Sequence, residues 1–472
     1  MNKITKLFIL AVILISSCKT PDKRPNIILI MTDDQGWYDA GFNGNTEIKT
    51  PHLDNLAFNG VIFDRFYSAS AVCSPTRASV ITGRNPLRME IPYANSGHMK
   101  DEEITIPEIL KKEGYSTGHF GKWHLGTLTK STLDANRGGR EKFNKHYTIP
   151  TEHGYDYFFC TESKVPTFDP MLYPNTFKKG ESMRYGWSAI KNHDSTKQYG
   201  TAYWKGDNQK ETTNLKGENS RIIMDRVIPF IQNSIKKEKP FFSTIWFHTP
   251  HLPVVSDSLQ RSKYSNLDLD KQLYYGSISA MDKQIGKLWE TLESSGIEKE
   301  TIIFFCSDNG PELKTPGSAN IFRGRKRSLY EGGIRVPAFV IWKNTIDGGK
   351  RIDYPAVTSD YMPTILDILN INYPNKRPFD GVSLLNVLNE SNKEREKPIG
   401  FICNPHVSWV TDQYKLIGDK KLEHFELYDI LNDKSEKENI IEEFPEIAKN
   451  LKADLVEWLE SVKKSEQGLD YN

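Results

Sequence analysis

Cys73 is the residue whose neighbours most directly suggest chemistry. It opens the run CSPTRASVITGR, residues 73–84. Pro75 suits the first turn of a helix and Gly83 suits its end, so the run predicts a helix that begins at the thiol. An anion beside Cys73 would then face the free N–H groups and the positive end of that helix. A buried cysteine before a helix is often an inert apolar residue, so the run needs support from elsewhere in the chain.

Two pairs of oxygen-bearing residues could together hold a hard divalent cation. Asp33 and Asp34 follow the apolar run 26–31, and Asp308 and Asn309 follow the apolar run 301–306. Adjacent carboxylates repel unless a cation lies between them, and carboxylate and amide oxygens suit Ca²⁺ or Mg²⁺ better than a soft metal. Each pair taken alone is more typical of a surface turn. No CxxC pair or Cys/His cluster indicates zinc.

Three further motifs carry basic or proton-transferring side chains. They are GKWHLG at 121–126 with Lys122 and His124, HTPHLP at 248–253 with His248 and His251, and FRGRKRSLYEGGIRVP at 322–337 with Lys326. Histidine titrates near neutrality and suits general acid or base catalysis, while lysine neutralises anions. For His248 we favour a structural role.

Taken together, the five motifs resemble those of type I formylglycine-dependent sulfatases, arylsulfatase-like proteins of the alkaline phosphatase superfamily. They occur in the family order from about residue 25 to Asp429. The resemblance implies a maturation enzyme that oxidises Cys73 to formylglycine, whose hydrated aldehyde offers one hydroxyl to attack sulfur and a second to expel the bound sulfate. It also implies Ca²⁺, or Mg²⁺, as the metal cofactor. The implied metal ligands are Asp33, Asp34, Cys73, Asp308 and Asn309, and the implied catalytic residues are Cys73, Arg77, Lys122, His124, His251 and Lys326.

The resemblance also assigns roles. Lys122 and Lys326 would bind sulfate, His124 would take a proton from the remaining hydroxyl, and His251 would meet the leaving-group oxygen. A sugar alkoxide leaves poorly, so protonation by an imidazolium is worth about two to four powers of ten. Three arginines of the last motif depart from the family pattern and either bind an acidic sugar or face solvent. They are Arg323, Arg325 and Arg327.

The elements that would position these residues alternate between strands and helices. Apolar runs at 26–31, 241–247 and 301–306 alternate with helical patterns such as 222–235 and 273–292. This alternation predicts an α/β fold with a large, mostly parallel or mixed central sheet between helices. Ligand sites in such sheets lie at the carboxyl ends of the strands. The family resemblance adds a smaller C-terminal subdomain with an antiparallel sheet and a terminal helix.

We expect four segments along the chain. They are a lipoprotein-type signal peptide at 1–18, a tether at 19–25, the catalytic domain at 26–355 and the C-terminal subdomain at 356–472. Within the catalytic domain, residues 127–219 are weakly periodic and indicate an elaborated insertion near the mouth of the site. Its aromatic and basic side chains either contact sugar or pack in the insertion's own core. They are Tyr185, Trp187, Tyr199, Tyr203, Trp204 and Lys205.

The N-terminus and the composition bear on location and partners. Lys3 and Lys6 precede the apolar stretch 7–15, which is too short to span a bilayer, and Cys18 closes a sequence that resembles a lipobox. We therefore expect export to the periplasm, outer membrane or cell surface with a lipid anchor at Cys18, a simple secretory signal being the alternative. The chain has five cysteines, and if Cys18 is lipidated and Cys73 is oxidised, the remaining three allow at most one disulfide. A formal net charge of +1 gives no reason to expect a nucleic-acid partner.

The expected activity is sulfuric ester hydrolysis on a sulfated carbohydrate. Algal polysaccharides such as ulvan or carrageenan rank ahead of glycosaminoglycans as the source of the sugar. One alternative is a formylglycine-dependent phosphodiester or phosphonate hydrolase. Another is a carbohydrate-binding protein without activity, and the complete set of candidate catalytic residues argues against it.

Overall fold

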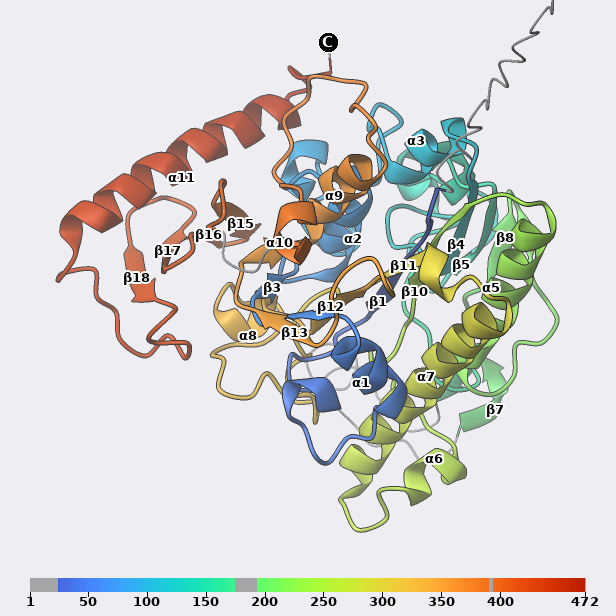
Figure 1. The fold of residues 1–472 in the computed structure, drawn as a ribbon. Helices are drawn as coiled ribbons and strands as arrows, with labels where there is room; N and C mark the ends of the chain where they lie inside the picture. Colours follow the sequence, from blue (N-terminus) through green and yellow to red (C-terminus); the bar gives the residue numbers. More distant parts are fainter. Residues whose placement is uncertain (1–23, 175–192, 390–393, 472) are drawn as a thin grey trace, which may run out of the picture.

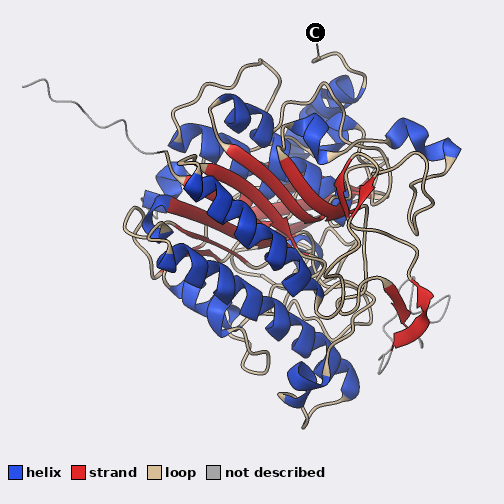
Figure 2. Cartoon of the chain, turned by 90° about the vertical axis from the view of Figure 1, so that its right-hand side faces the viewer, coloured by secondary structure: helices blue, strands red, loops and turns tan. Residues whose placement is uncertain are grey.

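The computed structural model describes residues 24–174, 193–389 and 394–471. Its centre is a ten-stranded sheet in the order β13-β2-β12-β11-β1-β10-β4-β5-β8-β9, with helices on both faces (Figures 1 and 2). The five neighbouring strands from β11 to β5 run parallel, and antiparallel pairs extend both edges. The predicted α/β fold class is confirmed.

The parallel strands are buried on both faces because helices cover both. They are β11 (Thr301–Ser307), β1 (Asn26–Thr32), β10 (Phe241–Trp246), β4 (Ser116–Lys122) and β5 (Tyr157–Thr161). In β1, Ile27 and Leu29 enter one hydrophobic core while Ile28 and Ile30 enter the other. The edge strands are β13 (Lys350–Ile352), β2 (Val61–Phe63) and β12 (Ala338–Ile341) on one side, with β8 (Trp204–Gly206) and β9 (Gln209–Lys210) on the other.

Two layers of helices enclose the sheet. The helices of the first core are α2 (Cys73–Thr82), α3 (Ile106–Lys112) and α9 (Tyr361–Ile368), and those of the second are α1 (Pro51–Phe58), α5 (Asn219–Lys236) and α7 (Leu269–Ser294). Helix α2 begins at Cys73 and ends at Thr82, and it is capped by Gly83, whose φ of 70° is a left-handed conformation that glycine adopts readily. Its predicted start and end are confirmed.

A four-stranded antiparallel sheet and a long helix form the C-terminal part. The strands are β15 (Ile399–Cys403), β16 (His406–Val410), β17 (Tyr414–Asp419) and β18 (Phe425–Asp429), and the helix is α11 (Pro445–Glu466), which lies along this sheet in Figure 1. This confirms the predicted architecture. Strand β14 (Ala356–Val357) pairs with β3 (Phe66–Tyr67) of the main body, and the boundary at residue 355 stays a prediction. The other elements are β6 (Leu172–Pro174), β7 (His193–Gln198), α6 (Ser258–Ser262), α8 (Glu331–Ile334), α10 (Leu385–Asn389) and short 3-10 helices.

The segment 127–219 differs from the expected insertion, because β5, β8 and β9 within it extend the central sheet. Tyr203 and Trp204 are 0% and 1% exposed and lie in the two hydrophobic cores. Of the two alternatives for these residues, core packing is therefore correct and sugar contact is wrong. Tyr185 and Trp187 lie outside the described residues, as do the signal peptide and most of the tether. None of the described helices combines the length and apolar character that a membrane span requires. The four cysteines in the described part of the chain are free thiols.

Candidate active site

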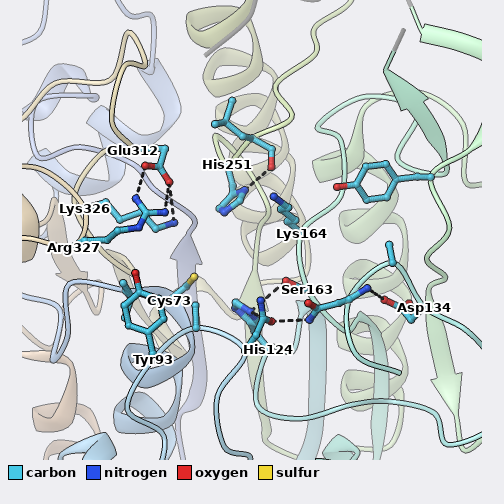
Figure 3. Close-up of a pocket in the computed structure, with 17 residues that line it drawn as sticks. Cys73, Tyr93, His124, Asp134, Ser163, Lys164, His251, Glu312, Lys326 and Arg327 are labelled. Atoms are coloured by element: carbon cyan, nitrogen blue, oxygen red, sulfur yellow. Dashed lines mark hydrogen bonds and ion pairs between the residues drawn. The ribbon is translucent and has the colours of Figure 1, made fainter. Parts of the chain in front are cut away.

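A pocket of about 250 Å³ lies where the parallel strands end (Figure 3). Each of the parallel strands β1, β11, β10, β4 and β5 is followed by polar residues. Because the carboxyl ends of parallel strands meet at one edge of a sheet, these residues gather there. Helix α2 brings its N-terminal residue Cys73 to the same pocket.

Cys73 and Arg77 share one face of α2 because they are four residues apart. Arg77 donates to Asp308 Oδ2 at 2.6 Å, lies 3.7 Å from Asp33 Oδ1 and stacks over the Trp246 ring. Burial raises the pKa of the Cys73 thiol, and nearby lysine charges offset this only in part. The unmodified thiol is therefore protonated at neutral pH and a poor nucleophile.

Four buried oxygen-bearing residues lie at the ends of β1 and β11. The Asp34 N–H donates to Asp308 Oδ1 at 3.1 Å, and Asn309 Nδ2 donates to Asp34 Oδ1 at 2.7 Å. These bonds tie the two strand ends together, and Asp33 lies beside them, so the residues predicted as metal ligands are brought into one cluster.

The oxygens of this cluster fit a hard cation. Asp33 Oδ1, Asp34 Oδ2 and Asn309 Oδ1 are buried acceptors with no hydrogen-bond partner in the described structure. Burial, and after it the charge of Asp33, raises the pKa of Asp308 to about 6. Ligand atoms of Asp33, Cys73 and Asp308 all lie within 4.8 Å of one another. The donor set therefore suits Ca²⁺ or Mg²⁺.

Two lysines flank the carboxylates. Lys122 Nζ donates to Asp33 Oδ2 at 2.7 Å, and Lys326 Nζ donates to Asp34 Oδ1 at 2.5 Å. Burial opposes the charge of Lys326, but Asp34, Glu312 and the other negative groups around it together outweigh burial and hold the pKa of Lys326 well above its usual value. Lys326 is thus a permanent positive charge at the pocket wall.

His124 is held with one nitrogen free. Asn136 Nδ2 donates to Asn95 Oδ1 at 2.7 Å, so that oxygen is an acceptor, and His124 Nε2 lies 2.8 Å from it and donates. Ser163 Oγ lies 3.2 Å from the same nitrogen. Burial and the charge of Lys122 lower the pKa of His124 well below its usual value. The ring is therefore neutral, and its partnerless Nδ1 is available to accept a proton.

His251 has the opposite tautomer. Its Nδ1 lies 2.5 Å from the carbonyl oxygen of Leu252, which can only accept, so Nδ1 carries the proton. Nε2 lies 3.6 Å from Asp34 Oδ2. Burial lowers the pKa of His251 well below its usual value. His248 instead bonds Thr161 Oγ1 at 2.7 Å, as expected for a structural histidine.

Of the predicted site residues, Cys73, His124, His251 and Lys326 line this pocket, and the contacts above link the others to Lys326 or to one another. The sequence reasoning missed several other residues. The missed residues are Asn95, Asn136, Ser163, Lys164 and Glu312, all lining the pocket. Of the three arginines, Arg327 lines the pocket and pairs with Glu312 at 2.5 Å. Arg325 donates to carbonyls of its own loop, and Arg323 bonds Tyr428 Oη and the Glu436 carbonyl. Arg323 is exposed, which agrees with the alternative that it faces solvent, whereas the partly buried Arg325 holds the structure of its own loop.

Comparisons with known proteins give a consistent picture. The family model described as "Sulfatase" matches residues 25–371, and one described as "N-sulphoglucosamine sulphohydrolase, C-terminal" matches residues 322–464. N-acetylgalactosamine-6-sulfatase of Mus musculus is 30% identical over 410 residues, which cover 83% of this chain and 71% of the relative. Steryl-sulfatase of Rattus norvegicus is 28% identical over 443 residues, which cover 83% of this chain and 75% of that relative.

Solved structures share the fold. That of Ps i-CgsB has a TM-score of 0.78 with 25% identity and covers 92% of both chains. BT33336S-sulf, from a study of glycosaminoglycan metabolism by Bacteroides thetaiotaomicron, has a TM-score of 0.72 with 27% identity and covers 94% of this chain and all of its own. A phosphonate monoester hydrolase of Agrobacterium radiobacter has a TM-score of 0.62 with 18% identity, which shows the fold alone.

Proposed function

Because this chain belongs to the sulfatase family and is thus a sulfuric ester hydrolase, we propose that it removes sulfate from carrageenan- or ulvan-type oligosaccharides. Formylglycine at residue 73 and Ca²⁺ would support the reaction. One observation carries the proposal. The N-terminus of α2 places Cys73 in a pocket lined by Lys326, with its sulfur within 4.8 Å of ligand oxygens of Asp33 and Asp308. Three oxygens of the cluster that includes these carboxylates lack a hydrogen-bond partner among the described residues.

Two groups complete this site in the proposal. Oxidation of Cys73 would supply a hydrated aldehyde with one hydroxyl to attack sulfur and a second to release the sulfate. Ca²⁺, held by Asp33, Asp34, Asp308, Asn309 and residue 73, would polarise a sulfate oxygen. The raised pKa of the Cys73 thiol supports the need for oxidation, because the unmodified side chain is a poor nucleophile.

Charge and position define the roles of the basic residues. Lys122 and Lys326 bind the sulfate oxygens, where two ammonium groups offset the charge that develops as the ester bond breaks. Arg77 holds Asp308 and Asp33 in place from the same helix face as residue 73. These contacts are charge-assisted and fixed before substrate arrives, so little reorganisation accompanies the reaction.

Two histidines divide the proton transfers. His124 accepts a proton from the hydroxyl of residue 73 through Nδ1, because Asn95 occupies Nε2. To deliver a proton to the leaving oxygen through Nε2, His251 would have to be an imidazolium, because Leu252 holds its other proton on Nδ1. The Asp34 carboxylate, 3.6 Å from Nε2, favours that charged form. The tautomer of His124 supports its role as proton acceptor, and the carboxylate beside His251 supports the charged form that a proton donor needs.

The carbohydrate assignment draws on the relatives. Ps i-CgsB matches 92% of this chain, and a structure of the protein with that name contains k-i-k-neocarrahexaose. This supports carrageenan-type sugars as the first choice. Tyr199, one of the aromatic residues expected to contact sugar, lines the pocket.

Glycosaminoglycan sugars are the second candidate. The 30% identity to a mammalian N-acetylgalactosamine-6-sulfatase and the match to BT33336S-sulf favour this possibility. Both candidates place a sulfated hexose in the pocket, so one panel of substrates compares them.

Sulfate release is the decisive measurement. The protein, produced beside a formylglycine-generating enzyme, is given desalted carrageenan, ulvan and glycosaminoglycan oligosaccharides, 4-nitrophenyl sulfate and a phosphodiester. We expect the highest kcat/KM on a sulfated sugar of the carrageenan or ulvan type. Higher kcat/KM on the phosphodiester than on every sulfated sugar would instead assign a phosphodiesterase.

The chemistry at residue 73 is checked in the same protein. Peptide mass spectrometry should find Cys73 converted to formylglycine, and Cys73→Ser should abolish turnover in a host that modifies cysteine only. Cys160→Ser, at a buried cysteine away from the pocket, is the matched control and should still turn over. Full activity with an unmodified thiol would contradict the proposal.

We also propose that the mature protein is exported and held at a membrane by lipid on Cys18. The support is the sequence alone, in which a short apolar stretch ends in a lipobox-like motif. Mass spectrometry of the mature N-terminus should find a diacylated Cys18. A free N-terminus at another residue would support a simple secretory signal.

A further inference from the structure

Lys164 is a charged residue of the pocket to which the proposed chemistry gives no role. It follows β5 at the third residue after Thr161, and its half-buried side chain lines the pocket. Figure 3 shows it beside His251, across the pocket from Lys326 and Arg327. Since His251 would meet the leaving oxygen, Lys164 lies on the side where the sugar would sit.

Lys164 differs from the other cationic side chains of the site in having no carboxylate partner. Among the described residues it makes neither a hydrogen bond nor an ion pair, whereas four neighbouring cations each contact a carboxylate. These pairs are Lys122 with Asp33, Lys326 with Asp34, Arg77 with Asp308, and Arg327 with Glu312.

The surroundings leave this charge uncompensated. Burial and the charges of Lys326 and Lys122 lower the pKa of Lys164. A divalent cation among the carboxylates would add to the positive excess. A sulfate ester brings one negative charge, which Lys122 and Lys326 already meet. An unpaired, partly desolvated ammonium is costly, and an anionic ligand would offset that cost.

We propose that Lys164 forms an anion subsite on the sugar side of the pocket, where it binds a second oxyanion of the substrate, a sulfate or a carboxylate. The inference rests on the proposed function and deepens it. The preferred substrate would be a sugar with two oxyanions, one that is cleaved and one that is recognised. Charge-assisted contacts of this kind add specificity as well as affinity.

Matched substrates test the subsite. Wild type, Lys164→Met and Lys164→Arg are assayed on monosulfated and disulfated N-acetylgalactosamine and on a sulfated uronate disaccharide with its carboxyl-reduced form. 4-Nitrophenyl sulfate carries a single anion and serves as the reference substrate. Lys283→Met removes an exposed lysine from α7 and is the control for loss of charge.

We expect Lys164→Met to lower kcat/KM by about ten- to a hundredfold on substrates with the second oxyanion, mainly through KM. On 4-nitrophenyl sulfate and the singly charged sugars the change should be under about threefold, and Lys164→Arg should retain most of the preference. The disulfated and uronate arms show whether the second group is a sulfate or a carboxylate.

Two results would overturn the subsite while leaving the proposed function intact. An equal loss on every substrate, 4-nitrophenyl sulfate included, would assign Lys164 to the cleaved sulfate. No loss on any substrate would make it a solvated side chain. Failure of wild type on all sulfated sugars, with turnover of a phosphodiester, would overturn both proposals.

Discussion

Several pocket residues adopt backbone conformations that helices and strands do not provide. Asp34, Asn95, His124 and Arg327 have φ values of 67°, 61°, 57° and 76°. Residues with a Cβ rarely adopt this left-handed region, and the strain persists only where surrounding contacts hold it. Hydrogen bonds to Asp308, Asn136 and Glu312 supply such contacts here. Local strain therefore directs these side chains into the pocket.

Removal of the proposed metal ion should expose the repulsion among the buried carboxylates. We expect chelation to abolish most activity and to lower the melting temperature, because three buried oxygen acceptors then lack a hydrogen-bond partner among the described residues. Calcium at roughly a hundred times its Kd should restore about 3 kcal/mol of stability. Differential scanning calorimetry with and without calcium measures the shift independently of turnover.

Asp33→Asn is the variant that links this effect to the site. The substitution keeps the side-chain shape but removes a charge, so the calcium-dependent rise in melting temperature should shrink and activity should fall by several powers of ten. Asp347→Asn, at an exposed carboxylate beside Lys350, should leave the calcium response intact. Stoichiometric zinc in the fully active protein would contradict the assignment.

At the scale of elements, one rule accounts for most of what the sequence predicted. Polar residues that follow apolar parallel strands must share a site, and this rule found the residues after β1, β10 and β11. It missed Ser163 and Lys164 because β5 lies among lysine-, asparagine- and glycine-rich neighbours that obscured its apolar run. Had Tyr157–Thr161 been recognised as a strand, the same rule would have predicted both residues.

Other features depend on long-range packing that no local pattern encodes. Asn95 reaches His124 from a loop, and its partner Asn136 comes from another loop. For Tyr203 and Trp204 the sequence leaves sugar contact and core packing open, and the pairing of β8 with β5 buries them. An aromatic residue in a weakly periodic segment serves a core and a binding surface equally well, so only the tertiary fold decides between them.

The start of helix α1 offers a pH-dependent test of element packing. Thr50 precedes α1 without capping it, and Asp282 of α7 accepts hydrogen bonds from the N–H groups of His52 and Leu53 instead. Burial raises the pKa of Asp282 to about 7, although these bonds oppose the rise. Its folded pKa exceeds its unfolded value, so its stability contribution is complete below the unfolded pKa and is lost as pH rises through about 7.

We therefore expect the Asp282 carboxyl to lower the free energy of unfolding by about 2 kcal/mol between about pH 5.5 and pH 8. Urea unfolding at both pH values should show a smaller decrease for Asp282→Asn than for wild type. Glu290→Gln, at an exposed position of the same helix, should behave as wild type. An identical pH dependence in all three proteins would show that Asp282 does not titrate in this range.

At the scale of the molecule, buried ion pairs join the C-terminal sheet to the catalytic body. Lys415 of β17 lies 2.9 Å from Glu331 and 2.8 Å from Glu436, with all three side chains buried. Glu331 begins α8, five residues after Lys326. The C-terminal sheet therefore supports the loop that carries a sulfate-binding lysine, and separation of the two parts would leave buried charges unpaired.

The end of the chain makes a second such connection, and we expect it to couple unfolding across the whole molecule. Asp470 contacts the buried guanidinium of Arg84 at 2.5 Å, just after α2 ends, and Tyr471 donates to Glu103. Asp470→Asn leaves that guanidinium with Glu103 alone, so the free energy of unfolding should fall by about 1–3 kcal/mol. Thermal unfolding followed by tryptophan fluorescence and circular dichroism should show one coincident transition at a lower midpoint, while Glu466→Gln, at an exposed residue of α11, should leave the midpoint unchanged. An earlier, separate transition of the C-terminal part would show instead that these buried contacts do not make the two parts a single cooperative unit.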